Sequence, residues 1–102
     1  MKIAYIAGPY RSKWGLPGRI LNILRARKVA KKYWKKGYAV VCPHMNSALM
    51  DGVVPDQSFL DGDIEILKHC DVIVMMHSWR WSRGAVDEWE FAKSSNLQVI
   101  YD

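Results

Sequence analysis

Four short apolar runs divide the chain, and longer stretches of mixed polar and apolar residues separate them. The runs read KIAYIAG from residue 2, YAVVCP from residue 38, DVIVMM from residue 71 and LQVIY from residue 97. Runs of this length that are apolar at consecutive positions are typical of strands buried on both faces. The first two runs end on Gly8 and Pro43, which break a strand sharply. The chain is therefore predicted to contain four buried strands.

The three stretches between these runs carry apolar residues at intervals of three and four. The first covers residues 19–36 and stops at Gly37, the second covers 55–69, and the third covers 84–95. This period predicts three amphipathic helices. The clearest case is the first helix, whose apolar face consists of Ile20, Ile23, Leu24, Ala26, Ala30, Tyr33 and Trp34.

Strands and helices that alternate in this way predict an α/β protein. Right-handed crossovers place the helices on both faces of a parallel sheet, which gives a Rossmann-like or flavodoxin-like three-layer sandwich. For four strands the economical order is 2-1-3-4, and residues 1–102 form a single domain. The order then reverses between the first and third strands, where open α/β sheets bind their ligands. We therefore expect a ligand where residues 8–11 and 77–83 meet.

Charge is distributed unevenly along the chain. The net charge is +5, yet residues 11–36 hold ten Lys or Arg and no acid, while every Asp and Glu lies at Asp51 or beyond. The basic stretch could bind nucleic acid or another anion, or could be a solvated helix face. It lacks interleaved aromatic residues and any nucleic-acid-binding motif, so we do not expect nucleic acid to be the main partner.

Other features narrow the class of protein. No apolar run approaches the roughly 20 residues needed to cross a bilayer, and no signal peptide is evident, so the sequence predicts a cytoplasmic protein without a membrane partner. Cys42 and Cys70 show no metal-ligand or redox spacing, so neither a metal nor another cofactor is expected.

The predicted crevice collects three kinds of chemical group. Donors suited to an anion come from Arg11, Ser82 and the start of the third helix. Flat rings come from Trp79, with Trp81 and Tyr10 as alternatives. Carboxylates come from Glu88 on an early turn of that helix and Asp63 on the second helix. Anion, ring and acid together indicate a nucleotide.

Each of these groups also has a structural explanation. Glu88 could simply interact favourably with the helix dipole, and Tyr5 lies in a predicted core strand. His44 could be structural or solvent-exposed as easily as a ligand contact. Asp63 flanks a buried stripe, where a carboxylate needs either a partner or a function.

Four motifs at matching strand ends resemble the nucleoside 2-deoxyribosyltransferase superfamily, which includes the 2'-deoxynucleoside 5'-phosphate N-hydrolases. These motifs are YIAGPYR, PH after the second strand, DGDIEILKHCDVIV and WSRGAVDEWEFA. The resemblance implies N-glycosidic bond cleavage, with Glu88 as nucleophile, Tyr5 orienting it and Asp63 assisting proton transfer to the base. It also implies a homodimer.

The resemblance favours a nucleotide hydrolase over a transferase. Ser82 stands six residues before the nucleophile, where the hydrolases have a phosphate-contacting serine, and Arg11 matches a phosphate ligand. Pro9 replaces a serine of their phosphate loop. A deoxyribosyltransferase and a non-catalytic nucleotide-binding protein remain alternatives. The expected substrate-binding residues are Gly8, Pro9, Tyr10, Arg11, His44, Trp79, Ser82 and Gly84.

Overall fold

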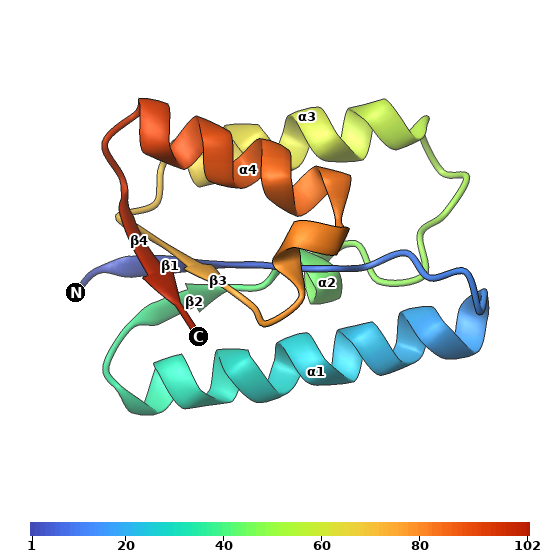
Figure 1. Cartoon of the computed structure of the whole chain (residues 1–102), viewed down its shortest axis with the longest axis horizontal. Coiled ribbons are helices and arrows are strands. Elements are labelled where there is room, and N and C mark those ends of the chain that lie inside the picture. The colour runs from blue at the N-terminus through green and yellow to red at the C-terminus, as the bar shows by residue number, and fades with distance from the viewer.

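The computed structural model describes residues 1–102 and contains the four predicted strands (Figure 1). The sheet is parallel and has the order β2-β1-β3-β4, as predicted. Tyr5 at the centre of β1 lies level with Val41 on β2 and Ile73 on β3. The strands are β1 (Ile3–Ala7), β2 (Ala39–Val41), β3 (Val72–Met75) and β4 (Gln98–Tyr101).

Helices cover both faces of the sheet and complete the expected three-layer α/β sandwich. In Figure 1, α1 lies along one face, and α3 and α4 lie side by side on the other. The helical elements are α1 (Leu16–Lys35), α2 (Pro43–Asn46), α3 (Asp56–Leu67), the 3-10 turn η1 (Trp79–Trp81) and α4 (Arg83–Ser94). None of these helices is both long and apolar enough to cross a membrane.

The two sides of the sheet have separate apolar cores. Ala4 and Ile6 of β1 pack with the face covered by α1, whereas Tyr5 and Ala7 pack with the face covered by α3 and α4. This alternation follows from the two-residue period of a strand. It directs the Tyr5 side chain toward the α4 side, which positions the candidate site.

The start of α1 and the presence of α2 are the main differences from the predicted helices. α1 begins three residues earlier than expected, at Leu16, because Gly15 takes a positive φ of 68° and Pro17 fits the first helical turn. The short helix α2 was not predicted. It begins with Pro43, whose fixed φ suits the first turn of a helix.

Gly8 follows β1 directly and lies against the end of the neighbouring strand. A Cβ atom at this position would be 2.6 Å from the sulfur of Met76 and 2.8 Å from its Cβ. Only glycine allows this close approach without movement of the neighbouring segment. The close packing keeps the ends of β1 and β3 together, where the candidate site begins.

Candidate functional site

A cavity of about 690 Å³ lies beyond the carboxyl ends of β1 and β3, at the predicted reversal of strand order. Its walls come from the segment after β1, from α2 and α3, and from the η1–α4 segment. The volume lies within the range of small-molecule binding pockets. Of the expected site residues, it is lined by Gly8, Pro9, Tyr10, Arg11, His44, Asp63, Ser82, Gly84 and Glu88.

Glu88 lines this cavity from the second turn of α4, although only 9% of the residue is exposed. It accepts a hydrogen bond from the phenol of Tyr5 and forms no ion pair. Burial raises the pKa of Glu88 to about 8; the hydrogen bond from Tyr5 opposes this rise, and the charges of Asp63 and Asp87 add to it. A buried acid with a raised pKa beside a cavity is a candidate functional group.

Tyr5 supports Glu88 from behind the cavity and does not line it. Burial raises the pKa of the Tyr5 phenol far above its usual range, and the charges of Glu88 and Asp63 raise it further. The phenol therefore keeps its proton at every physiological pH and donates a hydrogen bond to the Glu88 carboxyl group. This places Tyr5 as a positioning group for Glu88.

Asp63 reaches the same cavity from α3. Burial raises the pKa of Asp63 to about 6, which makes it able to exchange protons near neutral pH. Its charge raises the pKa of both Tyr5 and Glu88, so the three groups lie close enough to interact. The structure thus brings together the three residues expected from the sequence to be catalytic.

The start of α4 offers hydrogen-bond donors at the cavity wall. The Ser82 hydroxyl caps the helix by accepting a bond of 3.2 Å from the Ala85 amide, which leaves its own proton free to donate. The amides of Arg83 and Gly84, at the first turn, have no helical partner. Unpaired amides at a helix N-terminus are suited to an anion.

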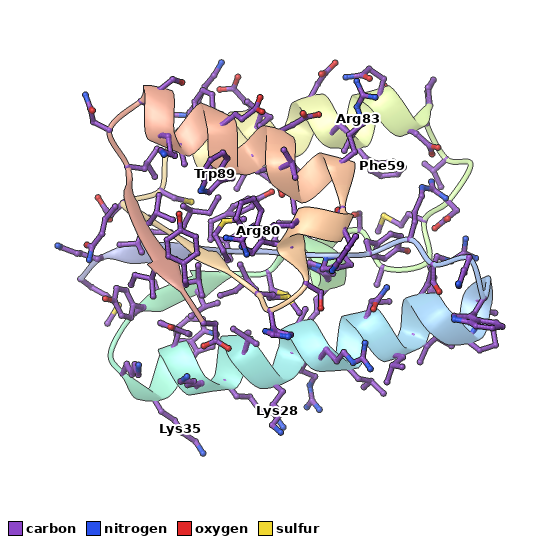
Figure 2. All side chains as sticks on the ribbon, viewed as in Figure 1. Lys28, Lys35, Phe59, Arg80, Arg83 and Trp89 are labelled. Carbon is purple, nitrogen blue, oxygen red and sulfur yellow. The ribbon has the colours of Figure 1, made fainter.

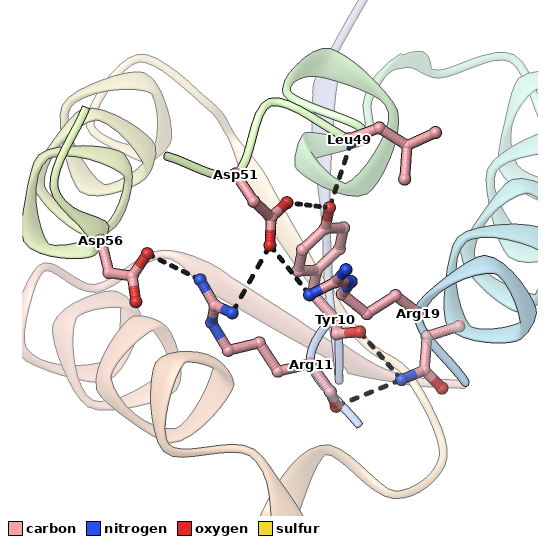
Figure 3. Close-up of polar contacts among 7 residues, drawn as sticks. Tyr10, Arg11, Arg19, Leu49, Asp51 and Asp56 are labelled. Carbon is pink, nitrogen blue, oxygen red and sulfur yellow. Dashed lines mark hydrogen bonds and ion pairs between the residues drawn. The ribbon is translucent and has the colours of Figure 1, made fainter. Parts of the chain in front are cut away.

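Arg11 lies across the cavity and is held by two acids (Figure 3). Its guanidinium donates to Asp56 at 2.6 Å and to Asp51 at 3.5 Å. Asp51 also accepts from Arg19 at 3.0 Å and from the Tyr10 phenol at 3.1 Å. This network connects the segment after β1 to the loop before α3, and no local sequence pattern indicated Asp51.

His44 is buried at the first turn of α2. Its Nε2 lies 2.8 Å from the carbonyl oxygen of Pro9, while Nδ1 has no partner. Burial lowers the pKa of His44, although the backbone carbonyls of Pro9 and Gly8 oppose this effect, so the ring is neutral at pH 7. A neutral ring that donates to Pro9 fixes the loop after β1 against α2.

Trp79 does not line the cavity, contrary to its expected role as a stacking surface for a base. Ser78 takes a positive φ of 78° and the η1 turn follows, so the indole packs into the core, 5.0 Å from the ring of Trp89. Arg80 covers it at 4.8 Å, and Figure 2 shows Arg80 and Trp89 in this region. Trp81 instead lines the cavity and is 89% exposed. The aromatic residues that line the cavity are therefore Trp81, Tyr10 and Phe59, and Trp81 is the most exposed of them.

Acidic side chains outnumber basic ones around the cavity. Two arginines, Arg11 and Arg83, face six carboxyl groups, which belong to Asp51, Asp56, Asp61, Asp63, Asp87 and Glu88. An anionic group of a ligand is therefore best accommodated between Arg11 and the start of α4. No group of three or more His, Cys, Asp or Glu side chains is arranged to hold a metal ion.

Comparison with known proteins places this chain in a family that is described as a domain of unknown function. A family model described as a domain of unknown function (DUF4406) matches residues 2–101, which is nearly the whole chain. No curated protein matches the chain. Inference about function therefore depends on the residues of the cavity.

Proposed function

The chain belongs to the DUF4406 family, and from the geometry of its cavity we propose that it hydrolyses the N-glycosidic bond of a (deoxy)nucleoside 5'-monophosphate. One observation carries the proposal: Glu88, Asp63 and the Tyr5 phenol converge beside one cavity, and Glu88 is free of any ion pair. The four sequence motifs that resemble the nucleoside 2-deoxyribosyltransferase superfamily also support it.

Glu88 is the nucleophile of the first step. A carboxylate oxygen of Glu88 forms an ester bond with the anomeric carbon, the bond from that carbon to the base nitrogen breaks, and its electron pair leaves with the base. Asp63 supplies the proton that neutralises the departing base. The two steps parallel those of a retaining glycosidase.

Water completes the reaction. A water molecule attacks the anomeric carbon, the ester bond breaks, and the Glu88 carboxylate is restored, while Asp63 takes up the proton that the water loses. In a transferase, a second base would take the place of this water. The products of hydrolysis are the free base and the sugar phosphate.

The ionisation of the two acids limits the rate at neutral pH. With a pKa of about 8, Glu88 is ionised in about one molecule in ten at pH 7. With a pKa of about 6, Asp63 is protonated in about one molecule in ten. The reactive form carries an ionised Glu88 and a protonated Asp63, and it is a minor form throughout the neutral range.

The substrate phosphate fits best between Arg11 and the start of α4. The Ser82 hydroxyl and the amides of Arg83 and Gly84 provide donors on one side. Arg11 is exposed and its ion pairs contribute at most about 1 kcal/mol each, so a phosphate can replace Asp56 as its partner. Trp81 at the cavity wall is the ring on which the base would stack.

The direct test is incubation of the purified protein with deoxynucleoside 5'-monophosphates, followed by chromatography for free base. We expect the wild-type protein to release base and Glu88→Gln to release none while still being stabilised by the ligand. Ligand-induced stabilisation without base release by the wild type would identify a binding protein. Base release that requires an added acceptor base would identify a transferase.

A further inference from the structure

A second groove lies on the face of the sheet covered by α1, opposite the candidate site. It has a volume of about 940 Å³ and runs between α1 and the segments that follow β3 and β4. Its floor includes His77, Ser78 and Asp102. Pro9 is the one residue that lines both this groove and the candidate site, so the two are separate.

The wall formed by α1 is strongly basic. Five cationic residues line the groove against a single acid, Asp102, which pairs with Lys32 at 2.9 Å. The other four cationic residues form no ion pair and are exposed, and Figure 2 shows two of them, Lys28 and Lys35, projecting from α1. The five cations are Arg25, Lys28, Lys31, Lys32 and Lys35.

These charges form a row because of their spacing. Arg25, Lys28, Lys32 and Lys35 follow one another at intervals of three and four residues, which keeps them on one flank of the helix. Ten residues of helix extend about 15 Å. One strand of a nucleic-acid duplex presents a phosphate about every 3.4 Å along the axis, so the row extends along roughly four phosphates.

The other residues of the groove argue for backbone recognition. No Trp, Tyr or Phe lines it, so bases would find no ring on which to stack. Its apolar side chains are few, chiefly Val29 and Met76, which is too little apolar surface to enter a lipid bilayer. We propose that this groove binds the phosphate backbone of double-stranded nucleic acid without reading its sequence. This binding is independent of the proposed activity in the other cavity.

The test is fluorescence anisotropy with a short labelled DNA duplex, titrated at several salt concentrations. If the four cations of the row each neutralise one phosphate, with Lys32 exchanging its exposed pairing with Asp102 for one of them, affinity should fall on the order of 100-fold between about 50 and 200 mM salt. A duplex of unrelated sequence should bind equally well. Absence of binding at the lowest salt concentration would overturn the proposal.

Two variants with the same net charge distinguish binding by the groove from nonspecific attraction by the overall positive charge of the protein. The groove variant carries Arg25→Ala, Lys28→Ala and Lys35→Ala, and the control carries Lys13→Ala, Arg27→Ala and Lys36→Ala, three exposed cations outside the groove. The groove variant should lose most of the salt dependence, since three of its four phosphate contacts are removed, and the control should keep it. Equal losses in both variants would refute the proposal.

A final experiment tests whether the anion that the groove binds is a lipid surface instead of nucleic acid. The wild-type protein is sedimented with vesicles that contain an anionic phospholipid, in the same buffer as the DNA titration. We expect the protein to remain in the supernatant. The proposal would be overturned if the wild-type protein sedimented with the vesicles, the groove variant did not, and the wild-type protein bound DNA only weakly. These results together would assign the groove to membranes.

Discussion

The hydrogen bond from Tyr5 to Glu88 should control the pH at which the protein is active, and Tyr5→Phe removes that bond alone. A hydrogen bond to a charged group contributes about 1.5–3 kcal/mol. Since about 1.4 kcal/mol corresponds to one pH unit, its loss should raise the pKa of Glu88 by about one to two from its value of about 8. The ionised fraction of Glu88 at pH 7 should then fall roughly 10- to 100-fold. Base release should slow by the same factor.

The assay is the initial rate of base release from a deoxynucleoside monophosphate between pH 6 and about pH 9. The loss in Tyr5→Phe should be constant up to about pH 8 and shrink progressively above it, because the Glu88 carboxyl of the variant still ionises at higher pH. Tyr38→Phe is the matched control, since this phenol packs beside the core on the other face of the sheet. A rate within twofold of the wild type at pH 7, or a loss that does not shrink above about pH 8, would refute the role assigned to Tyr5.

Further predictions follow from other contacts of the site. Because the pKa of Glu88 is raised above 4.5 in the folded chain, folding binds a proton that the unfolded chain releases above this pH. The stability due to this proton is full below about pH 4.5 and is lost as the pH rises toward 8. Denaturant titrations of the wild type should show this loss, and those of Glu88→Gln should not. The rate of base release by the wild type should rise up to about pH 6, stay level, and fall above about pH 8. Asp63→Asn should be slower, and its rate should level off only above about pH 8, without a fall. A variant with the same pH profile as the wild type would remove Asp63 from the proton transfer. Steady-state kinetics of Arg11→Ala should show a KM that rises more for nucleoside monophosphates than for nucleosides, and equal rises would contradict the phosphate assignment. In thermal melts, Gly8→Ala should lose about 1–3 kcal/mol of stability because its Cβ would contact Met76 too closely. Gly62→Ala should gain up to about 1 kcal/mol, because the space around its Cβ is open. Equal effects of the two substitutions would contradict the packing argument.

The sheet and its ligand-binding edge could be predicted from the sequence because both depend on local patterns. Consecutive apolar positions identified the four strands, and the three-to-four residue period identified the three long helices. Right-handed crossovers indicated a parallel sheet, the most economical arrangement gave the order of strands, and that order indicated where a cavity would form. The convergence of Glu88, Asp63 and Tyr5 followed from the resemblance of their motifs.

The details that the sequence did not indicate depend on backbone conformation and on contacts outside the local apolar pattern. The position of Trp79 is decided by the positive φ of Ser78 and by the ring of Trp89, neither of which the local pattern around Trp79 shows. Asp51 is a lone acid in a polar loop, and it becomes important only because the fold brings Arg11 and Arg19 to it. The contacts of Asp51 join residues more than 30 positions apart.

The most direct test of Glu88 as nucleophile is mass spectrometry of the protein after reaction with a nucleoside 5'-monophosphate whose sugar carries fluorine at the 2' position. The fluorine withdraws electrons from the anomeric carbon, which slows hydrolysis of the glycosyl ester and allows it to accumulate. The proposed mechanism predicts a sugar phosphate attached to the peptide that contains Glu88, and no adduct in Glu88→Gln. Base release with no adduct on Glu88, or an adduct on another residue, would contradict it.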